Sequence, residues 1–487
     1  MEVDRSTVIS NMLWRFAEKC GTQVVSFIVT LVLARLLLPE DYGVVSIIAI
    51  FTTIMNLFMD AGFRNALVQK LDADQTDYST VFYFNVFMGI FLYFLMYIFA
   101  PVISSFYEKV YMTPYIRVMS LTLILGGING VQAAIIAKKM EFKRFFFSSL
   151  SGTLLSALVG IAMAYFGFGV WALIAQRLVN EAVDTGFLWI TVKWRPSLVF
   201  SLKRLKPMFN YGSKLLGSSL LNALVTNLSG LVIGKVYPAD TIAYYDKGRQ
   251  IPNLVVENIQ TSVQSVLFPV LASKQNDKKQ IKRILRTSFM LAAYCIFPCM
   301  VGIGVCAESL VTILYTEKWI TMVPYLRLWC FIFAFFLLHT AHLQVIQALG
   351  RSDIFLKIEV IKQALTALAI FAAIPFGSLA MLAASCFVAA VSLYINAFPN
   401  QKLADYGFLE QIKDILPIIM LNMVMGIIVF LLGKLSLPTV FLLCIQIVAG
   451  VGIYVAGSSL LELESYKFIK NTLLIYVGKF FQLKRGR

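Results

Sequence analysis

The chain is divided into about fourteen apolar stretches, each near the length at which an α-helix crosses a bilayer. The expected spans are 9–35, 43–62, 80–101, 116–137, 147–166, 169–190, 208–236, 242–270, 287–306, 325–349, 354–374, 378–398, 415–433 and 438–457. With 59% hydrophobic and 14% charged residues, the chain has more apolar side chains than a soluble surface can hold. The sequence therefore predicts an all-α polytopic membrane protein, and no connection is long enough for a soluble domain.

The net charge of +16 is concentrated in alternate connections between these spans. The basic clusters fall at 138–144, 193–206 and 274–286, whereas the turns around 167–169 and 375–377 carry no charge. This alternation follows the positive-inside rule, so we expect both termini in the cytoplasm and no nucleic-acid partner. The N-terminus lacks a basic region followed by a cleavage site, so the first span is expected to be retained.

Short motifs recur about two hundred residues apart, which indicates an internal repeat. LARL at 33–36 corresponds to IGKV at 233–236, PYIR at 114–117 to PYLR at 324–327, and FG at 168–169 to FG at 376–377. Because each repeat holds about six spans, the two lobes should be related by an axis along the membrane normal. The expected domains are an N-terminal lobe (1–200), a C-terminal lobe (201–400), an extra helix pair (401–460) and a basic amphipathic tail (461–487) on the inner leaflet.

Three spans carry polar residues at intervals of three and four, which places them on one helix face. The candidate cavity residues are Arg15, Glu18, Lys19, Thr22 and Gln23 on the first span, Lys214 and Asn222 on the seventh, and Arg249, Asn253 and Glu257 on the eighth. A charge at the centre of a lipid-facing helix costs roughly 2.5 to 3.5 kcal/mol, so these faces should line a wet cavity between the lobes. Alternatively, the first set snorkels to the headgroups, or the eighth helix lies on the membrane surface.

Other polar positions have two possible interpretations each. Arg177 and Glu181 form either a structural ion pair or part of a transport site. His339 and His342 are either a proton relay or packed, hydrogen-bonded side chains. The cysteines lie in apolar spans, and the one pair a helical turn apart lacks a His or carboxylate nearby, so neither a metal site nor a cofactor is expected.

The runs LARLL at 33–37, PEDYG at 39–43, DAGF at 60–63 and FY at 106–107 resemble those of bacterial polysaccharide (Wzx-type) flippases. These belong to the multidrug/oligosaccharidyl-lipid/polysaccharide exporter superfamily. The resemblance implies two six-helix lobes, two extra C-terminal helices, and location in the bacterial inner membrane. It also implies alternating-access movement of an undecaprenyl-diphosphate-linked oligosaccharide to the outer leaflet. The expected partners are this lipid-linked oligosaccharide, membrane lipids, a coupling cation (sodium or a proton) and polysaccharide polymerase machinery, and the membrane potential is the alternative driving force.

The resemblance further implies a cation-lined cavity, with Arg15, Lys19, Lys214 and Arg249 at the matching positions. A diphosphate suits such cations, because arginine offers a planar fork and lysine a mobile charge. Acidic side chains on the same faces would neutralise the empty cavity or bind a coupling cation.

Three alternatives stay open. A multidrug exporter of the same superfamily would need a cavity lined mainly by acidic side chains. A membrane-embedded glycan polymerase or glycosyltransferase would need catalytic groups on sizeable loops, which this chain lacks. A non-transporting scaffold would not need polar helix faces. A transporter, rather than an enzyme, is therefore expected.

Overall fold

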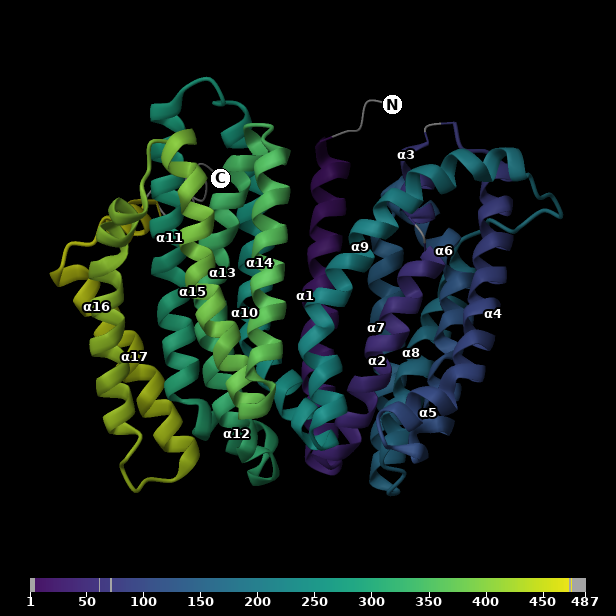
Figure 1. Ribbon diagram of the computed structural model, residues 1–487, viewed down its shortest axis with the longest axis horizontal. Coiled ribbons are helices and arrows are strands. Elements are labelled where there is room, and N and C mark those ends of the chain that lie inside the picture. Colours follow the sequence, from purple (N-terminus) through teal and green to yellow (C-terminus); the bar gives the residue numbers. More distant parts are fainter. Residues whose placement is uncertain (1–4, 61, 71, 473, 475–487) are drawn as a thin grey trace, which may run out of the picture. The chain divides into compact units, whose positions relative to one another are not determined.

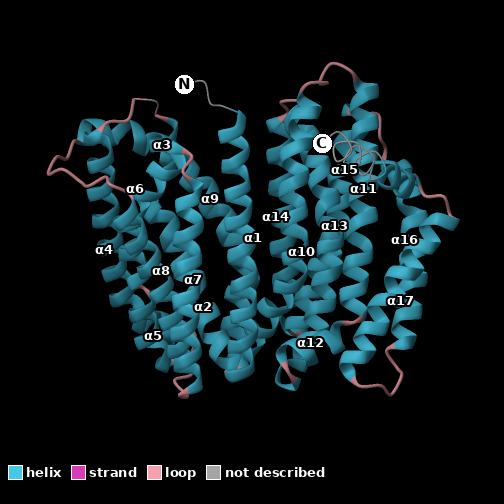
Figure 2. Ribbon diagram, turned by 180° about the vertical axis from the view of Figure 1, so that it is seen from behind, coloured by secondary structure: helices cyan, strands magenta, loops and turns pink. Residues whose placement is uncertain are grey.

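In the computed structural model, every regular element of the described residues is a helix (Figures 1 and 2). The structure describes residues 5–60, 62–70, 72–472 and 474. These helices form two compact units, Met1–Ala243 (unit 1) and Tyr244–Arg487 (unit 2). The boundary between the two units lies after the seventh long helix in the chain, because that helix packs against helices of unit 1. The lobe boundary at residue 200 stays a prediction about the repeat.

Unit 1 consists of α1 (Arg5–Leu36), α2 (Pro39–Asp60), α3 (Phe63–Gln69), α4 (Gln75–Phe106), the 3-10 helix η1 (Val110–Met112), α5 (Thr113–Met119), α6 (Leu121–Lys139), α7 (Phe142–Tyr165), α8 (Val170–Thr191) and α9 (Leu202–Val236). Unit 2 consists of most of α10 (Ala239–Ala272), then α11 (Lys278–Val305), α12 (Ala307–Tyr315), η2 (Glu317–Met322), α13 (Val323–Ala348), α14 (Ser352–Ala373), η3 (Ile374–Phe376), α15 (Ser378–Leu403), α16 (Phe408–Leu432) and α17 (Thr439–Leu460).

In the described residues, each range expected to span the membrane lies largely within helix. In the described part of the chain, ten helical segments are long and apolar enough to cross a membrane. The sequence did not predict α3 and α12 as separate helices. The short α3 is held by burial, since Phe63 and Leu67 pack in a core cluster with residues of α4, α6, α8 and α9.

The helices α7 and α8 approach closely because α7 has a small residue at every fourth position. These residues are Ser148, Gly152, Ser156 and Gly160. A Cβ atom added to Gly152 would lie 3.1 Å from the backbone oxygen of Asn180 on α8. Small residues at such spacing let two helix backbones meet inside a membrane, where apolar burial alone does not drive association.

One end of unit 1, called here its basic end, collects lysine and arginine side chains. Arg204 on α9 pairs with Asp74 before α4 (2.6 Å), and Lys138 at the end of α6 donates to the backbone oxygen of Lys70 (2.5 Å). Arg144 at the start of α7 donates to the last backbone carbonyl of α8 (2.7 Å). The backbone N–H at the third residue of α4 and the Arg204 guanidinium hold the pKa of Asp74 below its usual value.

At the opposite end of unit 1, the start of α2 and the end of α4 meet the end of α9. Lys235 Nζ lies 2.6 Å from Glu108 Oε1, and this lysine lowers the pKa of the Glu108 carboxyl. A Cβ atom added to Gly43 would lie 1.6 Å from the backbone oxygen of Ala239. Only glycine therefore fits at this crossing.

Two of the motifs that recur in the sequence, FG and PYxR, occur once in each unit and have a similar local structure there. Gly169 and Gly377 adopt positive φ angles of 52° and 101° directly before α8 and α15. The proline of each PYxR motif lies in the first turn of α5 or α13. The arginines of the motifs, Arg117 and Arg327, each donate to a backbone carbonyl of the preceding long helix, α4 or α11.

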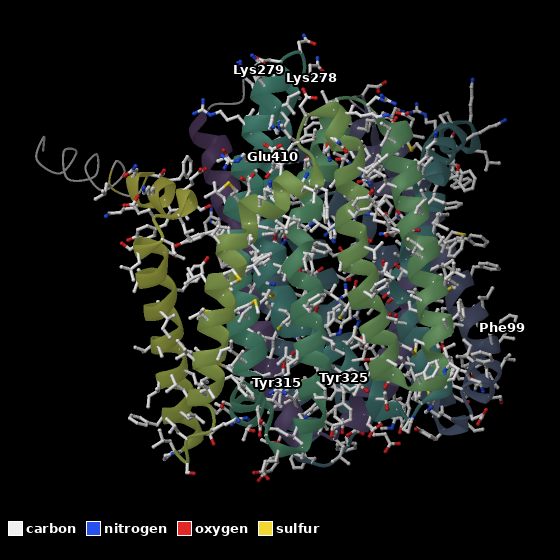
Figure 3. The ribbon with its side chains drawn as sticks, turned by 60° about the vertical axis from the view of Figure 1, so that its left-hand side comes forward. Phe99, Lys278, Lys279, Tyr315, Tyr325 and Glu410 are labelled. Carbon is white, nitrogen blue, oxygen red and sulfur yellow. The ribbon has the colours of Figure 1, made fainter. Side chains whose placement is uncertain are left out.

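In unit 2, α16 packs against α11, and α17 packs against both α16 and α12. Arg286 on α11 forms ion pairs with both helices of the extra pair. It lies 2.9 Å from Asp414 on α16 and 3.1 Å from Glu464, which follows α17. Figure 3 shows Lys278 and Lys279 at the end of unit 2 that carries Glu410, with Tyr315 at the other end.

Candidate functional site

The polar face of α1 lies in unit 1, where α1 packs against α7. Lys19 is exposed, whereas Glu18, Thr22 and Gln23 are half-buried. The Thr22 hydroxyl donates to the backbone oxygen of Glu18 (2.6 Å), so it is satisfied within its own helix. The Arg15 side chain lies outside the described part of the structure.

The second predicted set is divided between the units. Asn222 on α9 belongs to unit 1 and is exposed, and the Lys214 side chain is not among those described. On α10 of unit 2, Asn253 Nδ2 donates to Glu257 Oε2 one turn away (3.3 Å). A single cavity lined by α1, α9 and α10 therefore stays a prediction.

Arg249 on α10 has a specific aromatic neighbour that the sequence did not predict. Its guanidinium carbon lies 5.2 Å from the ring centroid of Trp329 on α13, a cation–π geometry. Trp329 is itself fixed, because its indole N–H donates to the backbone oxygen of Tyr245 (3.1 Å). The Arg249 cation therefore lies over the face of a fixed indole ring.

A polar cluster in unit 1, in which Asn129 and Ser148 are buried and Asp184 is half-buried, was missed because its members come from three helices. The Asp184 carboxylate on α8 accepts hydrogen bonds from Asn129 Nδ2 of α6 (3.0 Å) and from the Ser148 hydroxyl of α7. Glu181, one turn before Asp184, interacts electrostatically with it and with Arg177 and Arg64. No local spacing signals these contacts, since the partners of Asp184 are distant in the chain.

The two histidines lie inside unit 2 against α15. His339 Nδ1 is 3.1 Å from the Asn396 amide nitrogen, and His342 Nδ1 is 3.1 Å from that of Asn400. His342 is fully buried, and its ring centroid lies 5.2 Å from that of Phe289. These contacts agree with the interpretation that the histidines are packed, hydrogen-bonded side chains.

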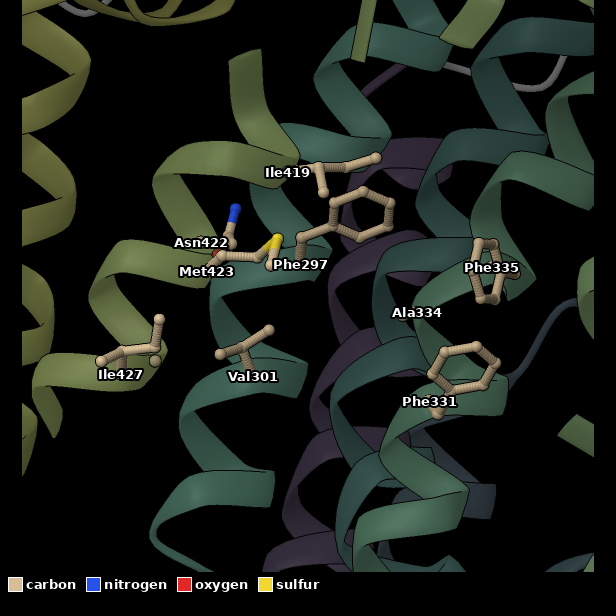
Figure 4. A pocket seen from close by; sticks show the side chains of 10 residues that line it. Phe297, Val301, Phe331, Ala334, Phe335, Ile419, Asn422, Met423 and Ile427 are labelled. Carbon is tan, nitrogen blue, oxygen red and sulfur yellow. The ribbon is translucent and has the colours of Figure 1, made fainter. Parts of the chain in front are cut away.

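The described cavities of unit 2 are apolar. One of about 400 Å³ lies between α11, α13 and α16 and is lined by Phe297, Phe331 and Phe335, with Asn422 as its amide side chain (Figure 4). Another of about 390 Å³ lies between α11, α16 and α17. Neither offers charged groups that could hold a diphosphate. Among the described residues, no group of three or more His, Cys, Asp or Glu side chains could hold a metal ion.

Ten apolar segments of spanning length, with polar faces on α1 and α10, define a multi-pass membrane protein. The chain belongs to the polysaccharide biosynthesis protein family, whose model matches residues 32–324. It is 26% identical to the teichuronic acid biosynthesis protein TuaB of Bacillus subtilis, over 87% of this chain and 88% of TuaB. It is 24% identical to the lipopolysaccharide biosynthesis protein WzxC of Escherichia coli, over 68% of each chain.

Solved structures show the same fold. The lipid II flippase MurJ in an inward closed conformation matches 92% of this chain and 98% of its own, with a TM-score of 0.73 and 14% identity. An inward-facing multidrug transporter of the MATE family matches 79% of this chain and 96% of its own, with a TM-score of 0.59 and 15% identity. At these identities the likeness establishes the fold of the chain and leaves its cargo open.

Proposed function

We propose that this protein is a flippase that moves an undecaprenyl-diphosphate-linked oligosaccharide from the inner to the outer leaflet of the cytoplasmic membrane. The observation that carries the proposal is the combination of polysaccharide-biosynthesis family membership with a fold like that of a lipid II flippase along nearly the whole chain. The names of TuaB and WzxC point to the same class of cargo, a cell-surface glycan.

The cargo's diphosphate would be held by the cations of α1, α9 and α10 while the cavity alternates between the leaflets. Arg249 suits this role because its guanidinium, which lies over the Trp329 ring, has a planar fork for bidentate hydrogen bonds to phosphate oxygens. Lys19 is exposed on the polar face of α1 and supplies a second charge. The amides of Gln23, Asn222 and Asn253 would serve sugar hydroxyls.

In this proposal the basic end of unit 1 faces the cytoplasm, as the positive-inside rule requires. The helices then make fourteen crossings, arranged as two six-helix lobes (1–200 and 201–400) and an extra pair (401–460), with both termini cytosolic. Lys143 and Lys203 would be cytosolic, and Gly169 and Gly377 would face the outside.

The test is a flipping assay with the purified full chain in proteoliposomes that contain undecaprenyl diphosphate bearing a fluorescent disaccharide. Flipping should expose lipid-linked label from the inner leaflet to a membrane-impermeant quencher, and empty liposomes should leave that fraction protected. A variant with Lys19→Ala and Arg249→Ala together should behave as the empty liposomes. If the wild-type chain moves a cationic drug but not the lipid-linked sugar, it is a multidrug exporter and the proposal is wrong.

A further inference from the structure

We propose that the connection between α8 and α9 carries a membrane anchor that inserts among the headgroups of acidic phospholipids. The anchor loop, as it is called here, comprises residues 197–203. It goes beyond the proposed function, because it does not depend on which cargo is moved. Only its assignment to the inner leaflet rests on the topology of the proposed function, in which the basic end of unit 1 is cytosolic.

The anchor loop exposes large apolar side chains at its apex. Leu198, Phe200 and Leu202 are 95%, 50% and 70% exposed. Both ribbon views show the connection projecting outward beyond α4 (Figures 1 and 2). The fold does not require such exposure, since Ala404 and Tyr406 in the connection between α15 and α16 are fully buried. A group of exposed apolar side chains beside polar ones marks an interaction surface.

Hydrogen bonds to the start of α4 hold the anchor loop in this shape. The backbone N–H of Ser197 donates to Ser79 Oγ (3.0 Å), and the backbone N–H of Ser201 donates to Thr80 Oγ1 (3.2 Å). Both acceptor side chains are buried. Because the backbone is fastened on each side of the apex, the loop is preformed, and its insertion into a membrane orders few additional residues.

The basic side chains of this connection indicate which partner fits the apolar apex. Arg195 and Arg204 are used within unit 1, since Arg195 donates to backbone carbonyls of the connection and Arg204 pairs with a carboxylate before α4. Lys193, Lys203 and Lys206 are exposed, and no ion pair of the described residues involves them. Lysines beside exposed apolar side chains suit an acidic membrane surface, where the ammonium groups meet phosphates and the apolar groups enter the interface.

The anchor would hold the start of α9 at the membrane surface, because α9 begins at Leu202. The direct test places a single cysteine at Leu198 in an otherwise cysteine-free full chain and labels it with the fluorophore NBD. In vesicles of phosphatidylethanolamine and phosphatidylglycerol, a lipid spin-labelled near its headgroup should quench this fluorophore more strongly than aqueous iodide does. Both leaflets have the same composition, so the result does not depend on how the protein is oriented.

The matched control is Gln275→Cys in the connection between α10 and α11, which is exposed but polar. The same fluorophore at this position should be quenched by iodide and little by the spin-labelled lipid. The anchor is overturned if the fluorophore at position 198 is quenched by iodide as strongly as that at position 275. The apex would then face water, as it would if it were a docking surface for a soluble protein.

The acidic-lipid preference is tested with the fluorophore at position 198 in vesicles that contain spin-labelled phosphatidylglycerol or spin-labelled phosphatidylcholine. The first lipid should quench more strongly, and Lys203→Gln should lower this preference by up to about fivefold, the contribution of one lysine near an anionic surface. Lys434→Gln, which removes an exposed charge between α16 and α17, should leave the preference unchanged. Equal quenching by the two lipids would overturn the proposed partner. An inserted loop in a protein that does not flip the lipid-linked sugar would refute the proposed function and leave the anchor intact.

Discussion

Replacement of Arg249 tests whether this side chain holds the cargo or only joins two helices. A hydrogen bond to a charged group contributes roughly 1.5 to 3 kcal/mol, so loss of one phosphate contact should slow flipping at limiting cargo about ten- to a hundredfold. The contact with Trp329, at 5.2 Å, contributes about 0.5 to 2 kcal/mol. Arg249→Ala removes both interactions.

The informative variants separate the two effects. Arg249→Lys keeps the charge but loses the planar fork, and should recover only part of the activity. Trp329→Phe keeps an aromatic face below an intact guanidinium, but it loses the indole N–H bond to the Tyr245 backbone. We expect this variant to lower protein stability while flipping per folded molecule changes less than about threefold, because the fork remains.

The assay is the proteoliposome flipping measurement, normalised to folded protein by size-exclusion chromatography. A double-mutant cycle then gives the coupling between positions 249 and 329. If Trp329→Phe slows flipping as much as Arg249→Ala, and the double variant is no slower, Arg249 serves to dock α10 on α13. The phosphate role would then have to be abandoned.

Three further predictions follow from single positions. In a cysteine-free variant, cysteines at Gly169 and Gly377 should react with an impermeant thiol reagent from outside the cell, and labelling only after permeabilisation would refute the topology. Asp77→Asn should lower the free energy of unfolding by about 1.5 to 3 kcal/mol in denaturant titrations, because the fully buried Asp77 carboxylate lies 2.7 Å from Lys70 Nζ. An unchanged unfolding midpoint would contradict this prediction. Gly43→Ala should abolish folded protein in the membrane, since its Cβ would lie 1.6 Å from a backbone oxygen of α10. The control variant Gly452→Ala on α17, where a Cβ would have nothing within 4 Å, should express normally. Equal expression of the two variants would show that the helix crossing at Gly43 can adapt.

The order of the long helices could be predicted from the sequence because membrane burial imposes one length and one composition on every span. The positions of turns were also predictable where glycine or proline dictates the backbone, as at Gly169 and Gly377. The short α3 was not predictable, because seven residues give no periodic signal and Phe63 is held by side chains far along the chain.

The candidate site could be predicted from the sequence only where polar residues recur at helical spacing along a single helix. The Asn253–Glu257 pair follows a four-residue spacing and is present in the structure. The Arg249–Trp329 stack and the Asp184 cluster depend on helices that meet only after folding. Local spacing favoured Arg177 and Glu181 on α8, whereas Asp184, which the spacing did not favour, is hydrogen-bonded to both α6 and α7.

The internal repeat also shows where the two units differ in chemistry. The spacing of 210 residues between Pro114 and Pro324 also separates Asn129 from His339, and Gln132 from His342. The helices α6 and α13 therefore carry a polar pair at the same place in the repeat. In unit 1 Asn129 donates to the Asp184 carboxylate, whereas in unit 2 both histidines face neutral amides on α15. The two units therefore share a position in the repeat but differ in the chemistry of the partners on the neighbouring helix.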